Sequence, residues 1–343
     1  MNYRQNILAI GLILASFIFG TSCQQGKTNQ NKLSSSDIAS VQLEALNYAD
    51  PTIFYHDGTY YLYGTVENIP NVGFEVFVSK NLQDWEGPYG AKDGFALHKD
   101  DVFGDKGFWA PQVFFHNEKF YMAYTANEQI AIATSDSPLG PFVQEEKKEI
   151  SGPVRQIDPF VFFDDDGKVY LYSVRLQDGN RLFVAEMLPD LSGIIEESVR
   201  ECISAIEPWE NTQNVTWPVA EGPTIVKENG LYYFIYSTND FRNPDYAVGY
   251  ATSDNPIGPW EKVSHNPILE KSLVDQNGTG HGDLFEDGNG ELHYVFHTHF
   301  SKENPKPRKT AIIKAKFETD ANNDAQKNLV FDPESFRFLN YKK

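Results

Sequence analysis

A short apolar run, a polar corner and an aromatic-rich run recur five times along this chain. The first copy runs from Asp50 to Tyr63 (DPTIFYHDGTYYLY), with its corner at Asp57-Gly58. Two runs rich in β-branched and aromatic residues around such a corner predict a β-hairpin. The other copies begin at 110, 158, 221 and 281. Their spacing of roughly 48 to 63 residues is typical of propeller blades.

A third apolar run follows each hairpin. In the first blade it is residues 74–79 (FEVFVS), and two of the other runs end almost identically. Residues 129–135 lead into DSPLGPF, and residues 246–253 lead into DNPIGPW. A fourth, less regular strand is expected after each Gly-Pro-aromatic turn. A single four-stranded sheet cannot bury both of its faces, so neighbouring sheets must stack around an axis. We therefore predict an all-β fold, a five-bladed β-propeller with about four antiparallel strands per blade, over 41–343. Residues 329–339 are a candidate closing strand.

The net charge and the N-terminus restrict the partners and the location. The formal charge of −19 argues against nucleic acid and anionic lipid surfaces as partners, because both are polyanions. Residues 1–22 look like a lipoprotein signal peptide, with Arg4, an apolar run and small residues before Cys23. The sequence thus predicts lipidation of Cys23, a flexible tether over 23–40, and an exported protein anchored by lipid in the periplasm or at the cell surface. Gly20 departs from the usual signal, and ordinary secretion is the alternative.

Three of the five hairpins open with a carboxylate, at Asp50, Asp158 and Glu221. Because the innermost strand of each blade lines the central channel, residues at matched starts of these strands meet at one mouth of the channel. Carboxyl groups that close together cannot all ionise at their ordinary pKa values. One protonated acid beside one ionised base is what glycoside hydrolysis requires. The alternative for each acid alone is a backbone cap at a turn.

The segments that open the first four hairpins resemble those of glycoside hydrolase family 43. They are YADPTI (48–53), FWAPQV (108–113), QIDPFV (156–161) and AEGP (220–223). The resemblance covers roughly residues 45 to 318. It implies a five-bladed propeller and an inverting hydrolase with a carbohydrate substrate. Carried over residue by residue, Asp50 is the general base, Glu221 the general acid, and Asp158 the residue that tunes and orients the acid. No metal or cofactor is required for bond breaking.

Three further residues are candidates for the same mouth of the channel. Trp109 stands just before Ala110-Pro111, where its ring could stack on a sugar or pack between blades. Arg308 resembles an arginine that reaches the sugar in some family members, and a solvated cation is the alternative. His281 opens the fifth inner strand, where the resemblance allows a structural Ca²⁺ ion in the central channel.

The histidines at 293, 297 and 299 share one face of a predicted strand. That spacing permits a zinc site, but no cysteine or acid accompanies it.

The resemblance leaves several activities open. We expect an exo-acting α-L-arabinofuranosidase or β-xylosidase acting on plant-type polysaccharide. Endo-arabinanase and galactose- or galactofuranose-directed enzymes are alternatives within the family. A related clan that acts on fructose units lacks support, because its Asn-Asp-Pro-Asn and Glu-Cys motifs are missing. A non-catalytic carbohydrate-binding lipoprotein is the alternative of another class. Specificity depends on loops, among them 66–73, 90–105 and 209–217, and the sequence does not predict the oligomeric state.

Overall fold

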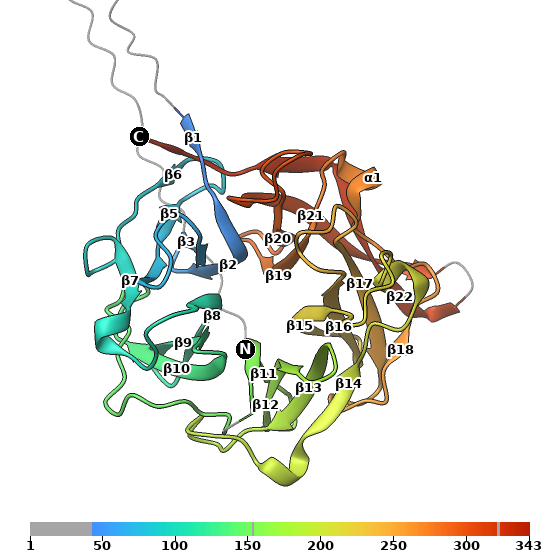
Figure 1. Ribbon diagram of the computed structural model, residues 1–343, viewed down its shortest axis with the longest axis horizontal. Coiled ribbons are helices and arrows are strands. Elements are labelled where there is room, and N and C mark those ends of the chain that lie inside the picture. The colour runs from blue at the N-terminus through green and yellow to red at the C-terminus, as the bar shows by residue number, and fades with distance from the viewer. Residues whose placement is uncertain (1–42, 153, 321–322) are drawn as a thin grey trace, which may run out of the picture. The chain divides into compact units, whose positions relative to one another are not determined.

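Five β-sheets surround a central axis in the computed structural model, which describes residues 43–152, 154–320 and 323–343 (Figure 1). This arrangement confirms the predicted five-bladed β-propeller. The predicted signal peptide, Cys23 and the tether over 23–40 lie outside the described residues. In the described ranges, no helix has the length and apolar character needed to cross a bilayer.

In every blade the repeated hairpin supplies the two inner strands, and its first strand lies next to the axis (Figure 1). The pairs are β2 (Tyr48–His56) with β3 (Thr59–Val66), β8 (Trp109–His116) with β9 (Lys119–Ala126), β11 (Gln156–Phe163) with β12 (Val169–Leu176), β15 (Ala220–Glu228) with β16 (Leu231–Thr238), and β19 (Gly280–Glu286) with β20 (Leu292–Thr298). Both residues of the corners Asp57-Gly58, Asn117-Glu118 and Asn229-Gly230 have positive φ. Such two-residue turns match the twist of the flanking strands.

The outer strands complete the blades. They are β10 (Gln129–Ser135) in blade two, β13 (Asn180–Glu186) and β14 (Arg200–Ile203) in blade three, β17 (Ala247–Ser253) and β18 (Glu261–Lys262) in blade four, and β21 (Lys309–Asp320) and β22 (Asn323–Phe338) in blade five. Blade two has three strands, because its expected fourth strand is reduced to one bridge between Thr134 and Val143. The described helical segments are short: α1 (Lys271–Val274) and 3-10 turns at Lys99–Asp101, Glu196–Ser198 and Pro208–Glu210.

Blade one closes the ring with strands from both ends of the described chain. Its order is β1 (Leu43–Ala45), β23 (Asn340–Lys342), β6 (Trp85–Glu86), β5 (Phe77–Ser79), β3 and β2. The closing strand is therefore β23, whereas residues 329–338 belong to β22, which pairs with β21. The expected run 74–79 is divided as well, since β4 (Gly73–Glu75) pairs with β7 (Phe95–His98). Val76 between the halves accepts a hydrogen bond from the Tyr89 amide, at 2.9 Å, outside the blade.

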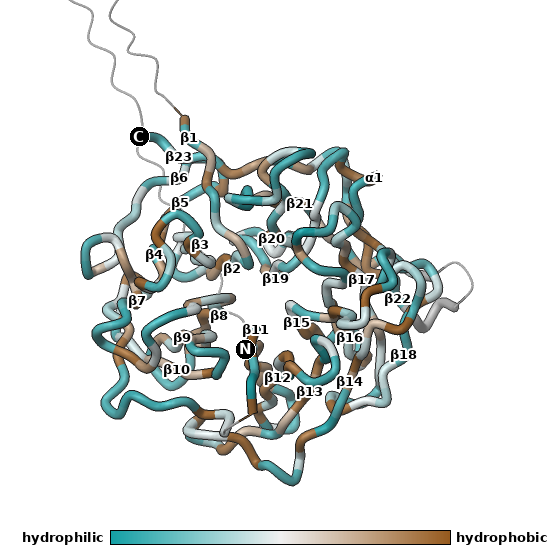
Figure 2. Tube along the Cα trace, in the orientation of Figure 1, coloured by the Kyte–Doolittle hydropathy of each residue, from teal (hydrophilic) through white to brown (hydrophobic). Residues whose placement is uncertain are grey.

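An apolar cluster fills each of the five interfaces between blades, while hydrophilic residues predominate in many loops at the rim (Figure 2). Representative buried pairs, in order around the ring from blades one and two, are Tyr63 and Tyr124, Ile132 and Leu171, Tyr172 and Phe234, Ile235 and Phe296, and Ile312 and Leu62. Burying one such side chain contributes about 1.5–3 kcal/mol. These interfaces fix the blades and hence the positions of the inner strands.

Candidate active site

Each innermost strand carries a β-bulge close to its start, shown by a register shift against the second strand. The residue at the bulge has a positive φ, between 42° and 61°, in all five blades. These residues are Asp50, Ala110, Asp158, Gly222 and His281. A bulge turns a side chain out of the regular alternation of a strand. The same local distortion therefore sets Asp50, Asp158 and His281 at one mouth of the channel.

The backbone amide of each bulge residue donates a hydrogen bond to a side chain of the preceding blade. The donor–acceptor pairs are Ala110 with Thr65 at 3.0 Å, Asp158 with Thr125 at 2.9 Å, His281 with Ser237 at 2.8 Å, and Asp50 with His297 Nδ1 at 3.1 Å. The equivalent position in blade three is Val174, whose side chain offers no acceptor. The Gly222 amide donates instead to Asp158 Oδ2, at 3.3 Å. This exception ties the carboxylate of Asp158 to the strand that carries Glu221.

Glu221 lies one residue before the bulge, so it is not strictly equivalent to Asp50 and Asp158. Its register matches that of Trp109, and Gly222 occupies the bulge. A side chain at 222 would be strained by its φ of 61°, and its Cβ would lie 2.9 Å from the ring of His281. Glycine therefore allows His281 to pack against the strand beside the acid.

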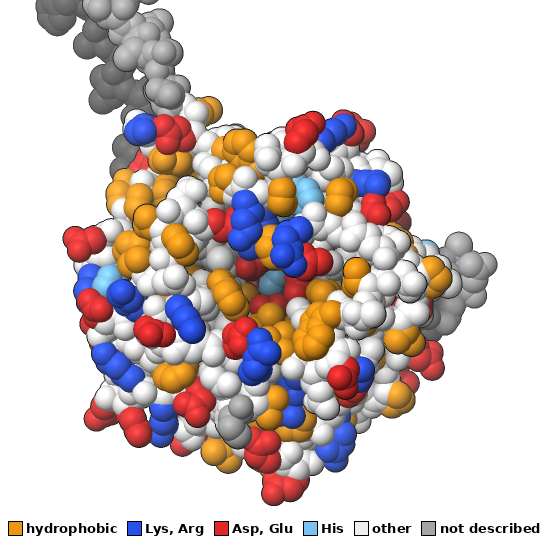
Figure 3. Space-filling view, viewed as in Figure 1, with side chains coloured by type: hydrophobic (Ala, Val, Ile, Leu, Met, Phe, Trp, Pro, Cys, Tyr) orange, Lys and Arg blue, Asp and Glu red, His pale blue; other side chains and the backbone are white. Residues whose placement is uncertain are grey.

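One cavity of about 370 Å³ brings together the residues predicted from the sequence of the folded body. Its lining includes Asp50, Trp109, Asp158, Glu221, His281 and Arg308. Figure 3 shows acidic and histidine side chains at the bottom of a hollow in this face, with basic side chains along one edge. The volume falls in the range of small-molecule sites, about 300–1,000 Å³.

Asp50 is buried among donors and cations. Burial opposes its ionisation, but Arg308, His281 and His297 together with a hydrogen bond from Thr65 outweigh burial and hold the pKa of Asp50 well below its usual range. Arg308 Nη1 lies 2.9 Å from Asp50 Oδ1, and the Thr65 hydroxyl donates to Oδ2 at 2.7 Å. Asp50 is therefore ionised at neutral pH.

Glu221 has the opposite environment. Burial raises the pKa of Glu221 to about 7, and the charge of Asp50 adds to this, although hydrogen bonds from Tyr246 and Asn180 act against it. The Tyr246 hydroxyl donates to Oε1 at 2.8 Å and the Asn180 amide to Oε2 at 2.9 Å. Glu221 is therefore protonated in a large fraction of molecules near neutral pH.

Asp158 is affected by the charges of both Asp50 and Glu221. Burial, followed by the charges of Glu221 and Asp50, raises the pKa of Asp158 well above its usual value. His281 Nδ1 lies 3.9 Å from Asp158 Oδ2 and 3.3 Å from Asp50 Oδ1. Environments that push the pKa values of neighbouring carboxyls apart provide one base and one acid at the same pH.

Arg308 lines the cavity, but its guanidinium group is bound to carboxylates. Besides Asp50 it contacts Glu67, with Nη2 3.2 Å from Oε1, and it lies 4.4 Å over the ring of Phe241. Trp109, the first residue of β8, is 38% exposed and lines the cavity. Sequence reasoning did not identify Glu67, which follows β3 outside any repeated motif.

Asn180, Tyr246 and Trp217 were also missed as site residues. Asn180 and Trp217 line the cavity, whereas Tyr246 is fully buried behind Glu221. The predicted loop 209–217 contributes Trp217, but the tryptophan at its other end, Trp209, packs against Tyr236 at 6.1 Å between ring centroids.

The channel below His281 is narrow, with a volume of about 30 Å³. Three carboxylates line it, Asp50, Asp158 and Asp283, and Asp283 accepts a hydrogen bond from Thr52 at 2.7 Å and lies 3.5 Å from the hydroxyl of Thr224. The amide of Gln112 is bonded to the backbone of Val161. Calcium takes about six to eight oxygen ligands, and these engaged side chains do not form such a shell. The calcium ion stays a prediction.

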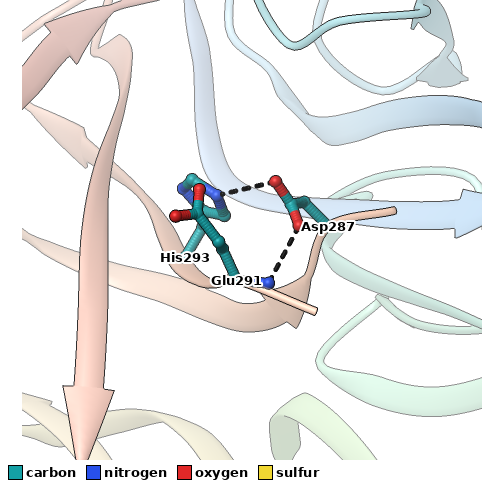
Figure 4. A group of neighbouring side chains, drawn as sticks. All are labelled: Asp287, Glu291 and His293. Atoms are coloured by element: carbon teal, nitrogen blue, oxygen red, sulfur yellow. Dashed lines mark hydrogen bonds and ion pairs between the residues drawn. The ribbon is translucent and has the colours of Figure 1, made fainter. Parts of the chain in front are cut away.

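The three histidines of the zinc hypothesis do not form one site. His297 contacts Asp50, His299 contacts the Phe241 carbonyl, and His293 faces Asp287 at the far end of its strand. Among the described residues, the one group close enough to share a metal ion is Asp287, Glu291 and His293, with atoms within 4.8 Å (Figure 4).

The two carboxylates of this group already have partners outside it or in the backbone of the turn. Asp287 Oδ1 accepts the amides of Asn289 and Glu291, and Glu291 pairs with Lys314 at 2.8 Å. Asp287 and Glu291 therefore stabilise the turn of the hairpin between β19 and β20.

Comparison with known proteins places this geometry in a family. A solved structure described as an endo-1,4-β-xylanase from Bacteroides thetaiotaomicron is 40% identical, with a TM-score of 0.80, over 89% of this chain and 100% of that chain. A β-D-galactofuranosidase of Aspergillus niger is 23% identical, over 78% of each chain. A xylosidase/arabinosidase of Butyrivibrio fibrisolvens is 28% identical over 72% of this chain, which spans 48% of that relative. The family model of glycosyl hydrolases family 43 matches residues 43–322, and the chain therefore belongs to that family.

Proposed function

We propose that this protein hydrolyses O-glycosidic bonds of plant-type polysaccharides or oligosaccharides with inversion at the anomeric carbon. Asp50 is the general base, Glu221 the general acid, and Asp158 the residue that tunes and orients the acid. One observation carries the proposal: Asp50 and Glu221 line one cavity, but a cation contacts Asp50 while neutral donors contact Glu221.

In this mechanism Asp50 removes a proton from a water molecule, and that water attacks the anomeric carbon. Glu221 gives its proton to the glycosidic oxygen as the bond to the leaving group breaks. An inverting enzyme needs a carboxyl separation of roughly 6.5–9.5 Å to admit the water, and we expect this separation for Asp50 and Glu221. The bond breaking requires these carboxyls and water, with no cofactor.

Asp158 acts on Glu221 through charge and through the backbone. Its carboxylate accepts the Gly222 amide at 3.3 Å, next to the acid in the chain. The pKa values of Asp158 and Glu221 are both raised, and ionisation of either carboxyl disfavours ionisation of the other. Asp158 therefore tunes the pKa of Glu221 through this repulsion, and its bond to the Gly222 amide fixes the strand from which Glu221 projects.

For the substrate we propose a pentose-containing plant polysaccharide, with exo action as an α-L-arabinofuranosidase or β-xylosidase. The name xylosidase/arabinosidase of one relative supports this choice. The relative named as a galactofuranosidase favours the galactofuranose-directed alternative. A non-catalytic carbohydrate-binding role is disfavoured, because all three carboxyls are present and held by specific partners.

The location rests on the sequence of residues 1–40 alone. We propose export and a lipid anchor at Cys23, which makes that anchor the contact with the membrane. Labelling with a radioactive fatty acid, with Cys23→Ser as control, tests the anchor.

The central test replaces the two carboxyls separately. Glu221→Gln and Asp50→Asn should each abolish turnover of arabinan, arabinoxylan and galactan fragments while the circular dichroism spectrum is unchanged. Asp240→Asn is the matched control, because Asp240 lines the same cavity but is paired with Arg242. Near-normal activity of either carboxyl variant on the substrate of the unaltered protein would remove the role given to that residue.

A further inference from the structure

Different groups hold the two oxygens of Glu221. The Tyr246 hydroxyl, which is fully buried, donates to Oε1 at 2.8 Å. The Asn180 amide, which lines the cavity, donates to Oε2 at 2.9 Å. Asn180 is thus the partner of the proposed acid on the side where a substrate would bind.

Trp217 fixes the orientation of that amide. An indole N–H can only donate a hydrogen bond, and Trp217 Nε1 donates to Asn180 Oδ1 at 3.0 Å. The amide nitrogen of Asn180 must therefore face Glu221. A flipped amide would lose both hydrogen bonds and would set an oxygen against the carboxyl group.

The backbone holds the two residues in register. Asn180 is the first residue of β13, and its backbone N–H donates to the carbonyl of Pro218, the residue after Trp217, at 2.9 Å. Further back in the loop, the Asn211 side chain accepts the Val215 amide at 2.9 Å and donates to its carbonyl at 3.0 Å. The loop end is therefore attached to blade three rather than free in solvent.

We propose that Asn180 and Trp217 are positioning residues for the acid step, and that the exposed ring of Trp217 contacts the leaving-group portion of the substrate. The proposal rests on the proposed function of Glu221. Trp217 is 45% exposed and lines the cavity, two hydrogen bonds from the carboxyl that protonates the leaving oxygen. Aromatic faces bind the apolar face of sugars by stacking.

The proton balance explains when Asn180 matters most. The proton of Glu221 passes to the glycosidic oxygen, which also takes the electron pair of the breaking C–O bond. Water supplies the new hydroxyl group, and its proton goes to Asp50. Glu221 ends as a carboxylate, and a hydrogen bond to an ionised acceptor is about twice as strong as one to a neutral acceptor. The bond from Asn180 therefore strengthens as the leaving group departs.

This strengthening predicts a dependence on the leaving group. A 2,4-dinitrophenolate departs without protonation, whereas a phenolate needs the acid. Asn180→Ala should lower kcat/KM about 10- to 100-fold for the phenyl glycoside but less than about 3-fold for the 2,4-dinitrophenyl glycoside. The probes are these two β-D-xylosides or α-L-arabinofuranosides, according to which sugar the unaltered protein hydrolyses.

The pH profile gives a second readout that a merely structural role would not move. The Asn180 hydrogen bond lowers the pKa of Glu221. Its loss should therefore move the alkaline limb of kcat/KM to higher pH. Trp217→Phe, which keeps a ring but removes the N–H, should shift both readouts in the same direction by less.

Trp209→Phe is the matched control, because it removes an indole N–H at the other end of the same loop, where the donor meets Glu207 at 3.0 Å. This variant should behave like the unaltered protein on both substrates. Equal losses on both glycosides with an unmoved alkaline limb, in Asn180→Ala and in Trp217→Phe, would overturn the proposal. Glu221→Gln distinguishes a failure of the proposed function from a failure of this inference. If that variant shows no leaving-group dependence, the assignment of Glu221 as the acid is itself wrong.

Discussion

Replacing Arg308 with methionine should destabilise the fold markedly. The side chain of Arg308 is 7% exposed and contacts Asp50 at 2.9 Å and Glu67 at 3.2 Å, whose side chains are 7% and 8% exposed. Methionine retains the apolar contact with Phe241 but leaves both buried carboxylates without this cation. Removing one partner of a buried ion pair costs about 3–5 kcal/mol in the free energy of unfolding.

The loss of stability in Arg308→Met should depend on pH in a defined direction. The pKa of Asp50 is lowered in the fold, so its ionisation contributes stability above its unfolded pKa of about 3.9, and that contribution is lost as the pH falls through the folded value. Without Arg308, burial would raise the pKa of Asp50. The deficit of the variant is therefore largest near neutral pH and shrinks as the carboxyl becomes protonated.

Urea unfolding at about pH 7 and about pH 4 measures both effects. Lys306→Met is the control, because Lys306 contacts the same oxygen of Glu67 at 3.0 Å but its side chain is 55% exposed. An exposed pair contributes at most about 1 kcal/mol. Equal losses of stability in the two variants, or a deficit in Arg308→Met that does not change with pH, would show that the buried pair does not stabilise the fold in this way.

Two other predictions follow from the same site. Activity on substrates with poor leaving groups should fall as the pH rises through about 7, where Glu221 loses its proton, and a profile of kcat/KM against pH that stays flat to pH of about 9 would contradict that role. Gly222→Ala should lower the free energy of unfolding by about 2–4 kcal/mol, because a strained φ is combined with a Cβ 2.9 Å from His281. Gly230→Ala, with φ of 83° and nothing within 4 Å, should cost only about 1 kcal/mol in the same urea titration.

The fold could be predicted from the sequence because its signals are local and repeated. Corners such as Asp57-Gly58 and Asn229-Gly230 fix a hairpin by turn chemistry alone. Repetition then places the starts of the inner strands at one mouth of the central channel, which is why Asp50 and Asp158 could be predicted as site residues. The division of residues 74–79 was missed, because it depends on a contact of Val76 with a loop 13 residues away.

The parts of the site outside the repeat could not be predicted. Asn180, at the start of a third strand, and Tyr246, in a loop, reach Glu221, while Glu67, just after a second strand, reaches Arg308. Their roles depend on contacts between residues far apart in the chain. The offset of Glu221 was visible in the sequence, since Gly222 aligns with Asp158 before the proline. Its consequence was not visible in the sequence: the Gly222 amide donates to Asp158, because Val174 offers no side-chain acceptor at the equivalent position of blade three.

The anomeric configuration of the first product distinguishes an inverting from a retaining reaction, and so tests the roles of Asp50 and Glu221. If Asp50 activates water while Glu221 protonates the leaving oxygen, the sugar released must have the opposite anomeric configuration to the substrate. Proton NMR spectra collected within the first minutes of hydrolysis, before mutarotation, distinguish the two anomers. We expect the signal of the inverted anomer to appear first. Initial release of the retained anomer would show that a carboxylate attacks the sugar itself, and would contradict the roles given to this pair.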